Sequence, residues 1–259
     1  MNSFRIWTVR NGPVLAIFAV IFALWELCCW LFHVPDFILP APSAIIERIV
    51  QTPQLMLVNA LVTAQEIVLG FGLSVVIGIP LAIAVVYSGV FERVAFPFMV
   101  SLQTIPKVAL APILVMWLGY GIMPKIMVAF LISFFPIVIS AVVGMRSAEK
   151  EMIYLVQSMG AGELTTFLKI RLPRALPSIF GGLKVGMGQA VVGATVGEFI
   201  AAEQGLGYLQ LISQVRLDTP LLFAAVVVLS LLGVILFKVV AVVERYALPW
   251  NRLRTEMIE

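Results

Sequence analysis

The sequence is poor in charge: charged residues make up 12% of its 259 residues, whereas hydrophobic residues make up 61%. A soluble domain typically has about 25% charged and about 45–50% apolar residues. A soluble core of this length would need a charged shell, which these residues are too few to form. The composition therefore excludes an ordinary soluble protein and predicts an integral membrane protein. Its apolar runs are continuous rather than alternating, which favours membrane-spanning helices over a barrel.

Residues that commonly serve catalysis or metal binding are also scarce. Cys28 and Cys29 are adjacent within an apolar run, and His33 is the single histidine. This spacing is wrong for a zinc site and poor for a disulfide. The sequence also lacks a G-x-x-x-x-G-K-[ST] phosphate loop and an H-E-x-x-H motif. We therefore expect no enzyme activity, no cofactor or metal bound by this chain, and no nucleic-acid partner.

Six apolar segments are candidates for membrane spans, each needing roughly 20 residues. The third begins after Lys107, and the fifth contains Glu198. A proton- or ion-coupled carrier usually needs an ionisable relay at mid-membrane. Lys107 and Glu198 do not clearly form such a relay, so they are weak evidence for an ion-coupled carrier. The expected spans are 13–31, 67–87, 108–124, 126–145, 181–202 and 219–243.

Lys and Arg residues are distributed asymmetrically between the connecting loops. With a cytoplasmic N-terminus, three of them fall outside (Arg48, Lys125 and Arg216), and Lys107 stays unassigned. By the positive-inside rule, this asymmetry predicts that both termini are cytoplasmic. The 13 basic residues on the cytoplasmic side are Arg5, Arg10, Arg93, Arg146, Lys150, Lys169, Arg171, Arg174, Lys184, Lys238, Arg245, Arg252 and Arg254.

Two segments lie outside the expected spans. Residues 42–57 predict a helix along the outer interface, capped by Ser43. Residues 146–184 form a cytoplasmic loop of 39 residues with six basic and three acidic side chains. Because this loop is too long for a simple connection, we expect it to meet a partner. Within it, residues 163–170 predict a short amphipathic helix that Pro173 and Pro177 end.

Small residues recur at helical spacing on two of the spans. Residues 70, 74 and 78 form one stripe, and residues 182, 186, 190 and 194 form another. Such stripes let helices approach closely in lipid, so packing is one interpretation. A translocation path along the third to fifth spans is the other. Glu198 is either an acceptor or interfacial charge at a helix end, or a gate or docking contact. The candidate path residues are Ser133, Gly193, Gly197 and Glu198.

The stretch 154–183 carries a spaced motif. Gly160, Ile170, Leu172 and Pro173 match the pattern Glu-Ala-Ala, three residues, Gly, nine residues, Ile, one residue, Leu-Pro. At its front, Tyr154-Leu155-Val156 replaces Glu-Ala-Ala. The stretch resembles the cytoplasmic loop of binding-protein-dependent ABC transporter permeases of the type I importer class.

Five further segments resemble the nitrate/sulfonate/taurine branch of these permeases. They follow one another in the order of that branch and, with the loop, extend over nearly the whole chain. They are FILPAPSAI (37–45), TAQEIVLGFGLSVVIGIPL (63–81), IPKVALAPILVMWLGYG (105–121), FFPIVISAVVGMRS (134–147) and GEFIAAEQGLGYL (197–209).

The resemblance implies an all-α permease of the bacterial inner membrane with six transmembrane helices. Residues 1–259 would form one domain, with a five-helix core over about 60–245 and a coupling loop over 146–184. The implied partners are membrane lipids, a second copy of the chain, two ATP-binding cassette subunits that hold ATP and Mg²⁺, and a periplasmic or lipid-anchored solute-binding protein. The implied ATPase-coupling residues are Gly160, Ala161, Glu163, Phe167, Ile170, Leu172 and Pro173.

The expected function is import of a small solute, driven by the separate ATPases. We expect an anion such as a sulfonate, taurine or nitrate. Similar permeases carry thiamine-pyrimidine precursors or flavin, so these solutes stay open. A self-sufficient channel or ion-coupled carrier is the alternative function. A membrane-embedded enzyme is a third hypothesis, which no group of catalytic residues in the sequence supports.

Overall fold

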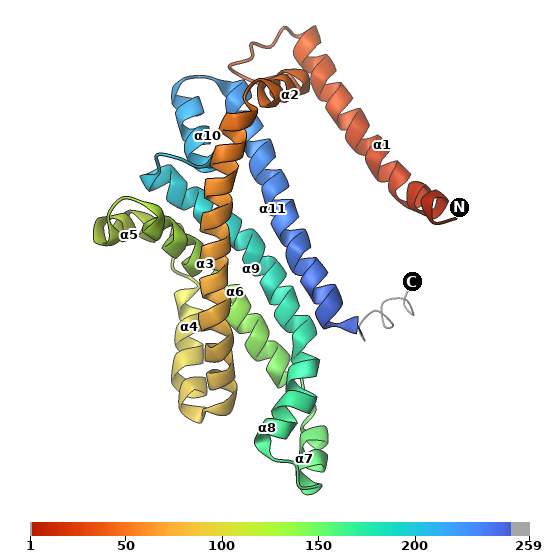
Figure 1. The fold of residues 1–259 in the computed structure, drawn as a ribbon, viewed down its shortest axis with the longest axis vertical. Helices are drawn as coiled ribbons and strands as arrows, with labels where there is room; N and C mark the ends of the chain where they lie inside the picture. The colour runs from red at the N-terminus through yellow and green to blue at the C-terminus, as the bar shows by residue number, and fades with distance from the viewer. Residues whose placement is uncertain (1, 250–259) are drawn as a thin grey trace.

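The computed structural model describes residues 2–249, with the side chains of residues 16–149 and 151–249, and every regular element in that part is a helix. Figure 1 shows long helices running along the length of the molecule, short helices at both ends, and α1 (Asn2–Leu31) standing apart from the others. The bundle itself is built from α3 (Pro53–Tyr87), α6 (Ile122–Arg146), α9 (Leu172–Ala201) and α11 (Thr219–Ala247).

Four helical segments of the described chain are long and apolar enough to cross a membrane: Pro53–Tyr87, Ile122–Arg146, Glu163–Ala201 and Thr219–Ala247. A bent pair adds a fifth if it counts as one span, and the apolar part of α1 (Asn2–Leu31) is shorter than these. Four or five of the six expected spans are thus long enough to cross a membrane, and the expected first span, 13–31, falls on the shorter apolar helix. The predicted orientation depends in part on basic residues near the termini. Of these, Arg252 and Arg254 lie outside the described residues, as do the side chains of Arg5, Arg10 and Lys150.

Helix α6 lies at the centre of the bundle. Its most apolar stretch is 56% buried, against 6% for that of α11. Small residues allow this central position: a Cβ at Gly70 of α3 would lie 2.6 Å from Ala129 Cβ, and one at Gly186 of α9 would lie 2.7 Å from Ile137 Cγ1. Because glycines on both neighbours face α6, α3 and α9 approach its backbone from two sides. Close helix packing is therefore what the two stripes of small residues provide.

The expected third span, 108–124, is wrong as one helix. The chain instead forms two arms bent by 87°: Phe91–Leu102, which comprises η1 (Phe91–Ala95) and α4 (Phe96–Leu102), and Lys107–Leu118, which comprises η2 (Lys107–Leu110) and α5 (Ala111–Leu118). Gly119 and Gly121 then adopt φ of 76° and 134°. L-residues with side chains rarely adopt such angles, so two glycines close together end α5 and allow α6 to begin at a new angle.

The expected end of a helix at Pro173 and Pro177 is also wrong. Residues 163–201 are helical throughout: α8 (Glu163–Thr166), the π-helical turn η3 (Phe167–Arg171) and α9 follow one another. Pro173 lies in the first turn of α9, and the Leu172 N–H bonds back to the Phe167 carbonyl in the π pattern. A π-turn shifts the hydrogen-bond register, which accommodates proline rings within a continuing helix.

The first two helices are joined by a carboxylate. Helix α2 (Pro42–Gln51) stops before Leu57, and its N-cap is Ala41 without a side-chain cap, so the expected capping by Ser43 is wrong. Ser43 instead donates to Glu26 of α1 through Oγ (2.6 Å) and its backbone N–H (3.0 Å). A carboxylate is favourable near the positive end of a helix, so the acidic residue of α1 anchors α2.

Candidate functional site

A helical hairpin forms one end of the molecule (Figure 1). Its first arm, α7 (Lys150–Ser158), is followed by Gly160 with a φ of 88°. The Gly160 N–H donates to the Gln157 carbonyl (2.9 Å), and the Ala161 N–H donates to the Val156 carbonyl (3.1 Å). These two bonds form a Schellman motif, which satisfies carbonyls at the end of a helix. A Cβ on Gly160 would meet nothing within 4 Å, so the backbone conformation alone requires glycine here.

The second arm packs inward on the end of α3. Phe167 lies edge-on to Tyr87, with ring centroids 5.8 Å apart, and the Arg171 guanidinium lies 5.1 Å from the Tyr87 ring. Ile170 is buried with Ile153 of α7. The hairpin is therefore tied to the bundle through aromatic, cation–π and apolar contacts.

The outward surface of the hairpin differs from the expected coupling residues. Phe167 and Ile170 were expected among the coupling residues, but Phe167 faces inward and Ile170 is buried. Leu172 packs against the main core, while Ala161 and Pro173 are half-buried. The expected motif thus contains much of the scaffold of the hairpin. Its outward apolar residues are 51% to 79% exposed, and we call them the hairpin face: Tyr154, Leu155, Met159, Leu164 and Leu168.

An apolar patch of this kind on a described surface indicates an interaction site. Sequence reasoning missed Met159 and placed Tyr154 and Leu155 only as departures from the motif. A period of about 3.6 residues could not reveal them together, because they lie on two arms separated by the turn at Gly160. Glu163, the last expected residue, is exposed in the first turn of α8.

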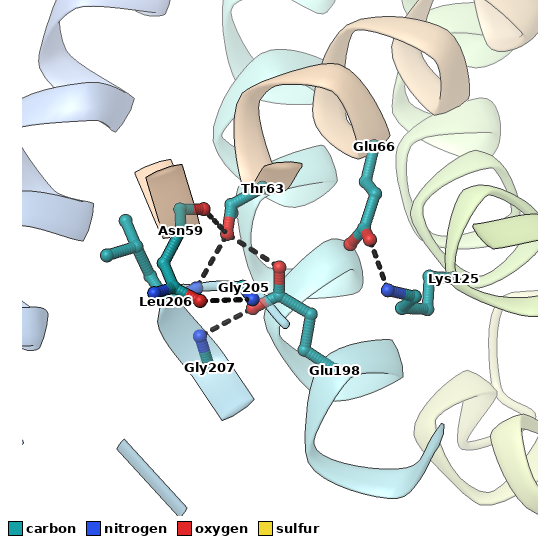
Figure 2. A network of polar contacts seen from close by, with 8 residues as sticks. All are labelled: Asn59, Thr63, Glu66, Lys125, Glu198, Gly205, Leu206 and Gly207. Carbon is teal, nitrogen blue, oxygen red and sulfur yellow. Dashed lines mark hydrogen bonds and ion pairs between the residues drawn. The ribbon is translucent and has the colours of Figure 1, made fainter. Parts of the chain in front are cut away.

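A buried polar cluster lies among α3, α9 and the start of α10, toward the end of the bundle opposite the hairpin (Figure 1 and Figure 2). Glu198 of α9 is fully buried, and its Oε1 accepts a hydrogen bond from the Thr63 hydroxyl of α3 (2.6 Å). Its Oε2 accepts the Gly207 N–H (2.5 Å) at the start of α10 (Leu206–Val215). Charge-assisted bonds of this kind are strong, and the carboxylate joins three helices.

Two more bonds complete the attachment of α10 to α3. Thr63 Oγ1 accepts the Leu206 N–H (2.8 Å), and Asn59 Oδ1 accepts the Gly205 N–H (2.7 Å). The first N–H groups of a helix have no partner within the helix. Side chains from α3 and α9 therefore bond three successive N–H groups, those of the N-cap and first two residues of α10.

A buried ion pair lies beside this network. The Lys125 ammonium lies 2.5 Å from Glu66 Oε1, and the two side chains are 7% and 0% exposed. Sequence reasoning assigned Lys125 to a loop on the outer side of the membrane and gave Glu66 no role. The charge of each residue was a signal, but the pairing of α3 with α6 was not readable from spacing.

The remaining path candidates lie between helices of one chain. The hydroxyls of Ser133 and Ser74 are 2.7 Å apart across the α3–α6 contact. A Cβ at Gly197 would lie 2.8 Å from Lys125 Cα, and Gly193 faces Ala129. The structure brings these residues and Glu198 close to α6 as packing and hydrogen-bonding positions. Their lining of a translocation path stays a prediction.

Comparison with known proteins identifies relatives of this chain. Residues 74–247 match the family described as "Binding-protein-dependent transport system inner membrane component". The chain is 35% identical to the formylaminopyrimidine transport permease protein ThiX of Halalkalibacterium halodurans, covering 91% of this chain and 94% of ThiX. It is 34% identical to the riboflavin transport system permease protein RibX of Chloroflexus aurantiacus, covering 95% and 91%. It is 28% identical to the taurine transport system permease protein TauC of Escherichia coli, covering 95% and 92%.

The fold has a counterpart among solved structures. A chain of the MetNI methionine ABC transporter in an inward-facing conformation superposes with a TM-score of 0.63 at 16% identity. The match covers 76% of this chain and 97% of that chain. At this identity the likeness concerns the fold alone.

Proposed function

Since the chain belongs to the family of binding-protein-dependent transport system inner membrane components, we propose that two copies of it form the solute path of an importer. The chain is the permease subunit of an ABC importer, a multi-pass protein of the inner membrane, and it is not the catalytic subunit. ATP is bound by ATPase partners, and a solute-binding protein delivers the solute. A self-sufficient carrier or an enzyme is inconsistent with this family.

The finer architecture that we propose has six spans, both termini in the cytoplasm and a type I core of five spans over about 60–245. One observation supports the core: 76% of this chain covers 97% of the MetNI chain, which leaves room for an additional helix such as α1. The proposed coupling element is the loop 146–184, whose hairpin face would seat in each ATPase. Its inward residue Phe167 would transmit movement to α3 because it joins the hairpin to the bundle, while Ile170 holds the two arms of the hairpin together.

The proposed solute is a nitrogen heterocycle of the aminopyrimidine or flavin kind. The observation that carries this proposal is the identity of 35% to ThiX and 34% to RibX, against 28% to TauC. Charge supports it as well, because the hollow beside the buried ion pair is lined by Glu66 and Glu203 but by a single basic residue, Lys125, among the described residues. The anion expected from the sequence is the second candidate, favoured by the likeness to TauC.

The solute-binding partner gives the test of this solute class. The protein that co-purifies with the cross-linked chain from the outer face of the membrane is mixed with an aminopyrimidine, riboflavin or taurine, and its melting temperature is measured. We expect a rise with an aminopyrimidine or riboflavin and none with taurine, since a ligand stabilises the fold that binds it. A rise with taurine alone would replace the heterocycle by the anion.

The proposed topology can be tested with single cysteines. Cys28 and Cys29 are first replaced by serine, and cysteine is then placed at position 48 of α2 or at position 169 of the hairpin. In intact cells, an impermeant maleimide is expected to label position 48 and to leave 169 unlabelled until the cells are opened. Labelling of 169 in intact cells would reverse the orientation.

A further inference from the structure

A hollow of about 550 Å³ opens between the N-terminal half of α3, the turn from α5 to α6 and the link from α9 to α10. Ligand sites in proteins commonly have volumes of about 300–1,000 Å³, so the hollow fits one ring solute. Its apolar wall includes Val62, Ile122 and Ile200. The polar residues that line it are Gln65, Glu66, Tyr120, Lys125, Glu203 and Gln204.

Glu66, one of the residues that line the hollow, has a carboxylate that can accept further hydrogen bonds. Among the described residues, neither Glu66 oxygen accepts a hydrogen bond, although the Lys125 ammonium pairs with Oε1 at 2.5 Å. The Lys125 and Glu66 side chains are 7% and 0% exposed. A buried carboxylate oxygen without a donor is costly, so a group entering from the hollow would gain by donating to it.

The hydrogen-bond partners of the two buried carboxyl groups near the hollow also point to Glu66 as the free acceptor. Glu198 and Glu66 are two buried carboxyl groups, and Lys125 is the one buried basic side chain beside them in the described part of the chain. Glu198 is satisfied at both oxygens by Thr63 and Gly207. The acceptor without a hydrogen-bond donor is therefore on Glu66, and an N–H of a ligand could supply that donor.

We propose that this hollow is a solute subsite in which Glu66 accepts an N–H of an amino-substituted nitrogen heterocycle. The proposal rests on the heterocyclic solute class of the proposed function. Lys125 holds the carboxylate while the subsite is empty and moves aside on its flexible stem when the ligand donates. At the rim, the exposed Tyr120 ring offers a stacking surface, and the amides of Gln65 and Gln204 offer further hydrogen bonds.

The test measures binding to the full chain in lipid nanodiscs without partner subunits. Radiolabelled 4-aminopyrimidine is the probe, and equilibrium dialysis gives the dissociation constant. We expect saturable binding to the wild type. Glu66→Gln should weaken it by about tenfold to a hundredfold, because a hydrogen bond to a charged group is lost. The control is Glu92→Gln, which removes an exposed carboxylate paired with Arg146 and should bind as the wild type does.

A double variant keeps the test decisive if Glu66→Gln leaves Lys125 buried, unpaired and disruptive. Glu66→Gln with Lys125→Met removes both charges at once, and we expect the same loss of binding at wild-type expression. Absence of saturable binding to the wild type would overturn the proposal, as would an unchanged dissociation constant in the double variant. Competition by taurine as strong as that by unlabelled probe would overturn the ligand class. The preference of the solute-binding protein is measured separately, so the proposed function can fail or hold independently.

Discussion

Replacing Gly160 by valine is expected to abolish the coupling of ATP hydrolysis to transport while the bundle stays folded. Gly160 has a φ of 88°, and a left-handed conformation costs an ordinary residue about 1–2 kcal/mol, and more for a β-branched one. The turn would relieve this strain by giving up the two Schellman bonds from Gly160 and Ala161. The hairpin face would then lose the arrangement in which α7 and α8 contribute to one surface.

Gly162, two residues further on, provides a matched control. Its φ is −71°, it is the N-cap of α8, and a Cβ there would also meet nothing within 4 Å. Serine is favoured at an N-cap, so Gly162→Ser should keep normal coupling. Both variants are reconstituted with the ATPases and the solute-binding protein, and solute-stimulated ATPase activity and uptake are measured. We expect a fall of at least about tenfold for Gly160→Val, corresponding to about 1.4 kcal/mol. Wild-type activity in Gly160→Val would contradict the coupling role of the hairpin.

Sequence reasoning succeeded where a single helix carries the information. The stripes on α3 and α9 were readable because small residues recur at helical spacing, and Gly70 and Gly186 do meet α6. It failed where backbone geometry decides the outcome. Gly119 and Gly121 end α5 within an apolar run, and the π-turn before Pro173 carries the helix past two prolines. A hydropathy profile detects neither the glycine-dependent end of α5 nor the π-turn.

The polar cluster was predictable only in part for a related reason. Glu198 was identifiable as an acid inside a span, and one of its two expected roles was acceptance of hydrogen bonds at a helix end. Its partners were not identifiable, since Thr63 lies on α3 and Gly207 on α10, and only the folded bundle brings them together. The Glu66–Lys125 pair was missed because it joins α3 to α6, and the bend before α6 places Lys125 inside.

Glycines next to Glu198 show why its carboxylate can reach the backbone of α10. Gly205 has a φ of 121°, and a Cβ on Gly207 would lie 2.7 Å from Glu198 Oε2. Such closeness leaves no room for a side chain, so the two glycines allow the acid to approach the N–H groups. The GLG sequence at 205–207 and the acid at 198 therefore act as one attachment between α9 and α10.

Replacing Glu198 by alanine should consequently lower stability strongly. The change leaves the Gly207 N–H without its buried acceptor, which costs about 1–3 kcal/mol, and it limits the Thr63 hydroxyl to the longer bond to the Asn59 carbonyl (3.1 Å). A cavity among α3, α9 and α10 adds to this cost. Thermal unfolding of the detergent-solubilised chain is the measurement, and Thr63→Val should shift it in the same direction because the Leu206 N–H loses its acceptor.

Glu198→Gln separates the structural role from a role of the charge. The glutamine oxygen can accept the Gly207 N–H, and its amide can donate to Thr63 Oγ1 if the Thr63 hydroxyl turns to the Asn59 carbonyl, 3.1 Å away. The network is thereby preserved, so we expect uptake within about twofold of the wild type and a loss of about 1 kcal/mol in stability, the difference between a charged and a neutral hydrogen bond. If Glu198→Gln folded normally but lost transport, the negative charge itself would be required, and Glu198 would act as a gate or a docking contact rather than as the acceptor that holds α10.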